Sequence, residues 1–215
     1  MDEEIIITGT NTRSEKIINF FIKNKKILII TILTIILLLI GYFSFDEIHK
    51  RNKVKIANQF NSTIIDYNNT DEKIKIVNDL TALIKKKDQT YSPLALYFLI
   101  DNDLISNNEN INSLFDVLIN KTNLEFEIKN LLIYKKALYN SDFAKENELI
   151  QMLNPIINSK SIWKSHALYL MAEFFYFNNE REKAKEFYNQ ILILSNSNAD
   201  IKLESQKRLN RDLGE

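Results

Sequence analysis

The chain has 215 residues, 45% of them hydrophobic, and its 28 basic residues balance 28 acidic ones. This length suits one domain of ordinary size together with a membrane anchor. A formal net charge of zero argues against a nucleic-acid-binding surface, which would normally carry an excess of basic residues. Cysteine is absent, so disulfides, thiol nucleophiles and thiolate metal sites are excluded.

Glycine and proline are scarce, with three and two residues, whereas asparagine is abundant. Strand turns and phosphate-binding loops usually need more glycine than this. Turns are expected instead at asparagine-containing pairs, at positions 107–108, 140–141 and 178–179, because asparagine tolerates the left-handed conformation that ends helices. The composition therefore predicts an all-α protein.

Residues 27–45, ILIITILTIILLLIGYFSF, carry no charge, and twelve of the first fourteen are Ile or Leu. A helix of this length extends roughly 28 Å, which matches the hydrocarbon core of a bilayer. A buried core helix is a poor alternative because such helices rarely stay uncharged for so long. A cleaved signal peptide is also disfavoured, because GYFSF offers no small-x-small cleavage site. We expect a retained transmembrane helix.

The span divides the chain into a tail, residues 1–26, and a helical domain, residues 46–215. Five basic residues between Arg13 and Lys26 precede the span, whereas Asp46 and Glu47 follow it directly, with four more basic residues by position 55. The positive-inside rule therefore favours a cytoplasmic tail by a narrow margin.

Beyond the span, residues 46–67 predict a charged helix with an apolar edge formed by Phe60, Ile64 and Tyr67. Residues 69–71 offer a break and a cap before a second helix over 71–87, whose apolar spacing is Ile76, Leu80, Leu83 and Ile84. Lysines 85–87 suit the C-terminus of that helix, where positive charge is favourable.

Three later segments can be aligned with one another. Tyr97, Tyr134 and Tyr169 then coincide, separated by 37 and then 35 residues, and each segment leads through a turn into a second amphipathic stretch. Helix, turn and helix at this period is the size of a helical-repeat unit. We therefore expect an α-solenoid of about four helical hairpins, closed by a C-terminal capping helix through Ile201, Leu203 and Leu209.

The last copy resembles a tetratricopeptide repeat. The residues at that family's offsets are Leu168, Ala172, Phe175, Ala184 and Tyr188, and the resemblance implies that they pack between helices. Asn179 takes the place of the usual turn glycine, Asn196 that of the terminal proline, and Asn112 that of a second-helix alanine in a more degenerate copy.

Phe174, Phe175, Tyr176 and Phe177 follow one another, so they cannot share one buried stripe of a helix. Phe175 is expected to face its hairpin partner, and Phe174 the next helix.

Tyr97, Tyr134, Tyr169 and Tyr176 are the candidate peptide-binding residues. In the tetratricopeptide resemblance the position of Tyr169 lines the binding groove, and an aromatic ring with one polar tip suits such a groove. The alternative, which the spacing favours, is that the three aligned tyrosines pack between repeats, since an aromatic stripe at helical spacing is more often core.

Nothing in the sequence indicates catalysis. His49 and His166 are the only histidines, no serine lies in a G-x-S-x-G elbow, and no glycine-rich phosphate loop is present. The carboxylates of residues 180–186 alternate with basic residues, as on a solvated face. We expect no enzyme activity, cofactor, metal ion or small-molecule substrate.

The layout as a whole resembles the YfgM-like family of bacterial inner-membrane proteins, ancillary subunits of the SecYEG translocon. This resemblance implies a cytoplasmic N-terminus, a periplasmic helical domain, and translocon subunits, periplasmic chaperones or emerging polypeptides as partners. The alternative hypothesis is a self-associating scaffold of an envelope complex, because surplus aromatic surface around residues 174–177 would mark a protein interface.

Overall fold

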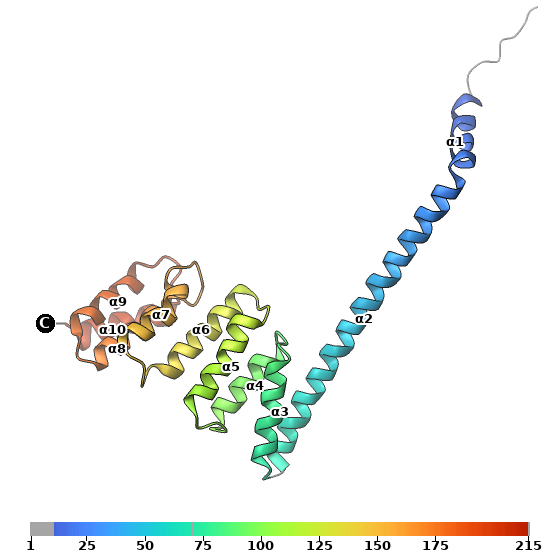
Figure 1. Ribbon diagram of the computed structural model, residues 1–215. Coiled ribbons are helices and arrows are strands. Elements are labelled where there is room, and N and C mark those ends of the chain that lie inside the picture. The colour runs from blue at the N-terminus through green and yellow to red at the C-terminus, as the bar shows by residue number, and fades with distance from the viewer. Residues whose placement is uncertain (1–10, 70, 215) are drawn as a thin grey trace, which may run out of the picture. The chain divides into compact units, whose positions relative to one another are not determined.

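The computed structural model describes residues 11–69 and 71–214, and in this part of the chain it forms ten helices and no strand (Figure 1). The all-α prediction is confirmed. Residues 1–10 of the predicted tail lie outside the described residues. The chain divides into two compact units between Lys55 and Ile56.

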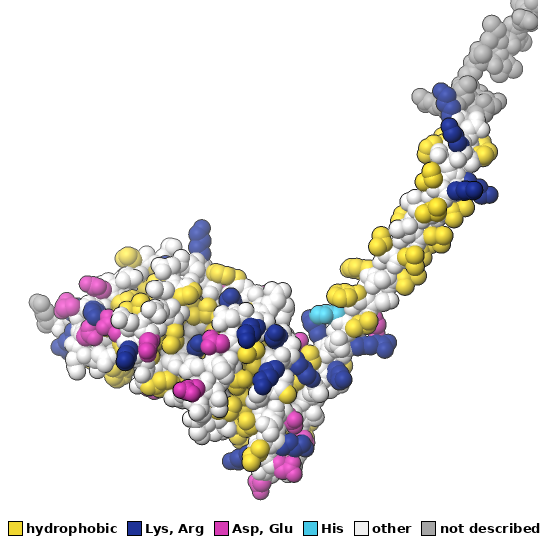
Figure 2. Space-filling view, in the orientation of Figure 1, with side chains coloured by type: hydrophobic (Ala, Val, Ile, Leu, Met, Phe, Trp, Pro, Cys, Tyr) yellow, Lys and Arg dark blue, Asp and Glu magenta, His cyan; other side chains and the backbone are white. Residues whose placement is uncertain are grey.

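The first unit holds α1 (Asn11–Lys23) and the start of α2 (Lys25–Asn69). Within the described residues, α2 is the one helix long and apolar enough to cross a membrane, and none of its apolar window is buried. This exposure distinguishes α2 from the buried core helix of a soluble protein. A signal sequence near the N-terminus would pass the same test of length and composition. Figure 2 shows its apolar side chains together with basic side chains near the N-terminal end.

Two hydroxyl groups inside the apolar stretch are satisfied within the helix. Thr31 and Thr34 donate hydrogen bonds of 2.9 Å to the carbonyl oxygens of Ile27 and Ile30. These hydroxyls therefore need no water, which a bilayer core would not supply.

The second unit is a series of sequentially packed hairpins (Figure 1). Each helix from α3 onward packs against the next one in the chain, and α8 and α9 share the most extensive contact. The predicted apolar edge of α2 joins this unit, because Phe60 and Tyr67 contact Tyr91 and Phe98 of α4. The helices are α3 (Lys73–Lys85), α4 (Tyr91–Asp101), α5 (Asn108–Lys121), α6 (Phe126–Asn140), α7 (Glu146–Ile157), α8 (Lys164–Phe177), α9 (Arg181–Ile193) and α10 (Ala199–Arg211).

Three helices end on a non-glycine residue in the left-handed conformation. These are Lys87, Asp103 and Asn179, with φ of 58°, 49° and 61°. After α8, the Asn179 N–H donates to the carbonyl of Tyr176 at 3.1 Å, and the next N–H donates to that of Phe175 at 2.9 Å. This is the Schellman pattern, and it confirms the predicted turn role of Asn179.

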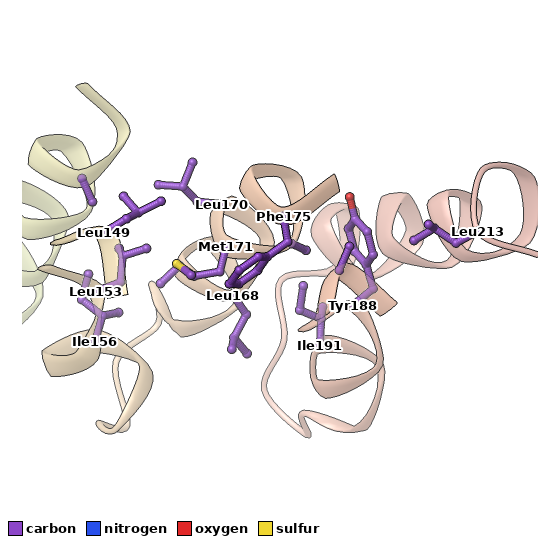
Figure 3. Packing of buried hydrophobic residues seen from close by; sticks show 14 residues of the cluster. Leu149, Leu153, Ile156, Leu168, Leu170, Met171, Phe175, Tyr188, Ile191 and Leu213 are labelled. Carbon is purple, nitrogen blue, oxygen red and sulfur yellow. The ribbon is translucent and has the colours of Figure 1, made fainter. Parts of the chain in front are cut away.

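The buried side chains form two clusters, one across α3 to α6 and one across α6 to α10. Figure 3 shows the second cluster, in which residues of α7, α8 and α9 point toward one another. Ala172 and Ala184 have no exposed surface, so α8 and α9 approach closely. Leu168, Phe175 and Tyr188 are buried with them.

Asn112 has a specific partner in the structure. Its side-chain amide exchanges two hydrogen bonds, of 2.9 and 2.8 Å, with that of Asn140 between α5 and α6. Asn140 is almost fully buried, so the reciprocal pair satisfies polar groups that would otherwise destabilise the interface. The asparagine at position 112 therefore has a structural role between these two helices.

The C-terminal helix α10 packs on α8 and α9, although one predicted contact is wrong. Ile201 and Leu209 lie against the cluster with buried Ser205 between them, whereas Leu203 is 57% exposed. Residues four apart share a helix face, and a residue two positions on points to the other side. Leu213, beyond the helix, is buried instead.

Candidate functional site

A cavity of about 670 Å³ lies between α6 and α8. Each of these is the first helix of its hairpin, and the two hairpins follow one another in the chain. Tyr134 lines this cavity from α6 and Tyr169 lines it from α8. These tyrosines occupy aligned positions of consecutive repeats, so stacking the hairpins brings them to the same surface. Both are half-buried, and burial raises the pKa of each phenol.

Apolar side chains surround the cavity. Leu138, Phe143 and Phe177 all line it and are all exposed, Phe177 to 76%. Single exposed apolar residues are normal, but several around one cavity of this size are typical of a binding surface. Phe177 therefore lines the edge of this cavity, which its position in the aromatic run 174–177 did not predict.

Acidic side chains line the cavity. Asp142 and Glu173 line it, and no lysine or arginine does so among the residues that the structure describes. Phe174 also lines the cavity, next to these acidic groups.

A polar network behind the cavity joins three helices. The carboxylate of Glu173 in α8 accepts hydrogen bonds from the Tyr188 hydroxyl in α9 and from the Arg208 guanidinium in α10, the latter at 2.7 Å. Arg208 also pairs with Asp212 at 3.0 Å and lies 5.3 Å from the ring centroid of Tyr176. Burial and the neighbouring carboxylate of Glu173 raise the pKa of Tyr188.

This network was missed in the sequence, although a signal for it exists. Glu173 is the only acidic residue of α8, inside the apolar run ALYLMAEFFYF. A charge enclosed by apolar neighbours needs a partner, because an unpaired buried charge is strongly destabilising.

The four predicted tyrosines do not share one site. Tyr134 and Tyr169 share the cavity between α6 and α8, where Tyr134 also stacks on Trp163 at 6.0 Å. Tyr97 lines a separate cavity of about 380 Å³ between α4 and α6, and burial, aided by Asp101, raises its pKa to about 12. The ring of Tyr176 contacts α10, where the Arg208 guanidinium lies over its face.

His166 is the only histidine after Ile56, and it packs beside the Tyr134 and Trp163 rings with a buried Nδ1 that has no protein partner in the described structure. Burial lowers the pKa of the imidazole from 6.5. The unfolded chain therefore binds the proton more tightly, and the resulting destabilisation, absent well above pH 6.5, grows as the pH falls toward the folded pKa. We expect the free energy of unfolding to decrease between about pH 7 and pH 5.

Denaturant unfolding of the wild type and of His166→Gln at a series of pH values measures this effect. The substitution should remove the pH-dependent part in this window, because carboxylates such as Asp212 titrate at lower pH. Parallel profiles for the two proteins would show that His166 is not the cause.

Aromatic rings, apolar side chains and two carboxylates line the cavity, and across residues 11–69 and 71–214 no group of three His, Asp or Glu side chains could hold a metal ion. The described residues define an all-helical protein of sequential hairpins with one candidate membrane-spanning helix. Comparison of the chain with protein-family models, curated proteins and solved structures finds no match in any of the three.

Proposed function

We propose that this chain is a single-pass membrane protein whose helical domain binds polypeptide segments in the cavity between α6 and α8. The observation that carries the proposal is the placement of Tyr134 and Tyr169 in one cavity whose edge exposes Leu138, Phe143 and Phe177. A volume of about 670 Å³ suits a few side chains of an extended segment.

The hairpins are proposed to be tetratricopeptide-like. Three features support this: the repeat period, the fully buried alanines Ala172 and Ala184 in facing helices, and the tight turn at Asn179. In such a stack the first helices of successive hairpins form a continuous binding face. Both tyrosine-lined cavities lie between such first helices.

The proposed location is the bacterial inner membrane, with a cytoplasmic N-terminus and a periplasmic domain. The proposed partners are translocon subunits, periplasmic chaperones or emerging polypeptides. Anchoring by α2 would raise the effective concentration of the binding face toward chains at the membrane, so tight intrinsic affinity is not needed. Protease added to intact spheroplasts should digest the domain, and a protected domain would contradict this orientation.

The acidic lining makes the proposal more specific. Asp142 lines the cavity without a basic residue beside it there, whereas the carboxylate of Glu173 is paired with Arg208 behind the cavity. We therefore expect apolar segments that carry lysine or arginine to bind better than the same segments carrying glutamate, by about tenfold or more.

Site-specific crosslinking tests the proposal with the full chain in detergent micelles. A photoreactive residue at Phe177 should trap a synthetic apolar-basic peptide, and one at Ile193, which is also exposed and apolar but does not line the cavity, should not. The glutamate version of the peptide should crosslink more weakly at Phe177. Equal labelling at both positions would count against binding in this cavity.

The self-associating scaffold has less support. That hypothesis depended on aromatic surface around residues 174–177, but Phe175 is buried, and Phe174 and Tyr176 are half-buried against the core. Only Phe177 of the four is largely exposed. A sedimentation coefficient that increases with protein concentration would support the scaffold hypothesis.

A further inference from the structure

The tail predicted for residues 1–26 contains a helix, α1, with a large apolar surface. Five of its side chains are each between 56% and 68% exposed. They are Ile17, Ile18, Phe20, Phe21 and Ile22. An apolar surface of this extent is unfavourable in water and indicates a partner.

The apolar side chains are segregated from the charged ones. At 100° per residue, the five cover roughly 200° of the helix circumference, whereas Lys16, Asn19 and Lys23 share the opposite side. Residues 16–26 include four lysines and no acidic residue. A wide apolar face with a basic polar face is typical of a helix that lies in the plane of a membrane surface.

The position of α1 in the chain favours a bilayer over a protein as its partner. Only three residues, positions 24–26, separate Lys23 from the first residue of the apolar span. Three residues reach at most about 10 Å, so the end of α1 stays at the interface wherever α2 enters the membrane.

A single transmembrane helix that includes α1 agrees less well with the sequence than a separate helix at the membrane surface. A helix from Ile17 to Phe45 would be roughly 44 Å long, well beyond the hydrocarbon thickness, and would bring Lys23, Lys25 and Lys26 toward the membrane interior. α1 ends at Lys23 and α2 begins at Lys25, and at Asn24 between them the side-chain amide and the backbone N–H both donate to the Phe20 carbonyl at 3.0 Å. The Leu28 N–H donates to the Asn24 carbonyl at 2.9 Å, so the junction keeps its backbone hydrogen bonds. Figure 1 shows a bend between α1 and α2 at this point.

We propose that α1 is an interfacial helix that binds the surface of an anionic phospholipid bilayer. Ile17, Phe20 and Phe21 enter the boundary between headgroups and acyl chains, and the lysines contact anionic headgroups. This inference rests on the proposed membrane span but not on polypeptide binding. If the inference is correct, the anchor prefers anionic lipid, and the lysine-bearing face of α1 stays at the membrane surface.

Depth measurements on the full-length protein test the inference, and the cysteine-free sequence allows single labels. Fluorescent probes are attached to Phe21→Cys on the apolar face, Asn19→Cys on the polar face, and Leu37→Cys inside the span. The protein is reconstituted in vesicles of phosphatidylcholine alone or mixed with phosphatidylglycerol. In the mixed vesicles, lipid-attached quenchers should quench the probe at position 21 at least about twice as strongly as that at position 19.

A charge-neutral variant separates lipid binding from simple hydrophobicity. Each lysine near an anionic surface contributes about fivefold to binding, so Lys16→Gln with Lys23→Gln should lower the surface-bound to free ratio of α1 roughly 25-fold. The matched control, Lys53→Gln with Lys55→Gln, makes the same charge change beyond the span and should leave the ratio unchanged.

The probe at position 37 distinguishes the two proposals. Immersion at 37 together with equal solvent exposure at 19 and 21 would overturn the interfacial helix and leave the anchor intact. Solvent exposure at 37 would overturn both. Equal immersion of position 21 in both vesicle types would overturn the anionic preference.

Discussion

Replacing Phe175 by alanine is expected to lower the free energy of unfolding of the helical domain by about 3–5 kcal/mol. Phe175 is 1% exposed, its ring stacks on Phe187 at a centroid distance of 5.4 Å, and the Lys183 ammonium lies 4.8 Å from its centroid. The truncated side chain would leave a void between α8 and α9 that close-packed neighbours fill only in part.

The matched control lies two residues away. Phe177→Ala makes the same chemical change in the same helix, at a side chain that is 76% exposed. Its effect on stability should stay within about 0.5 kcal/mol, whereas it should weaken binding of the apolar-basic peptide in the cavity. Equilibrium denaturation in urea measures both variants, and similar losses for the two would contradict the assignment of Phe175 as core and Phe177 as surface.

Replacing Arg208 by methionine is expected to cost about 2–4 kcal/mol, because it leaves the enclosed Glu173 carboxylate without its cationic partner. Both side chains are mostly buried, and the pair is 2.7 Å apart. The loss should loosen α10, since Arg208 also binds Asp212 and covers the Tyr176 ring.

A second arginine provides the control for this pair. Arg211 also contacts Asp212, but its side chain is 68% exposed, so Arg211→Met should cost less than about 1 kcal/mol. Adding Glu173→Gln to Arg208→Met should restore part of the loss, because the unpaired charge is then absent. Additive effects in this double-mutant cycle would show that the two side chains are not coupled.

Several features of the fold follow from local patterns in the sequence. The apolar run 27–45, the scarcity of glycine and the helical spacing of apolar residues correctly predict an all-helical chain with one exposed apolar helix. The left-handed end at Asn179 was predicted for the same reason, because cap chemistry depends on residues within one turn, whereas the left-handed conformation of Lys87 was not predicted. The burial of Ala172 and Ala184 agrees with the repeat pattern, since a period reports which face a residue occupies.

The candidate site could be predicted only in part. The alignment placed Tyr134 and Tyr169 at equivalent positions, but their cavity also needs the loop that carries Phe143. Tyr176 shares a helix face with Tyr169, seven residues earlier, and both approach Arg208 of α10. Of these two tyrosines only Tyr169 lines the cavity. Leu203 was assigned to the cap because it is apolar, and a side chain's hydrophobicity does not specify the direction in which it points.

By itself the sequence determined the helices, their ends, the apolar span and the order in which hairpins follow one another, because these depend on residues within a turn or two. Tertiary structure alone decided the pairing of Glu173 with Arg208, which are 35 residues apart, and of Asn112 with Asn140, which are 28 apart. It also decided which tyrosines share a cavity. The physical reason is that period and capping are local, whereas partner choice depends on how helices from distant parts of the chain pack together.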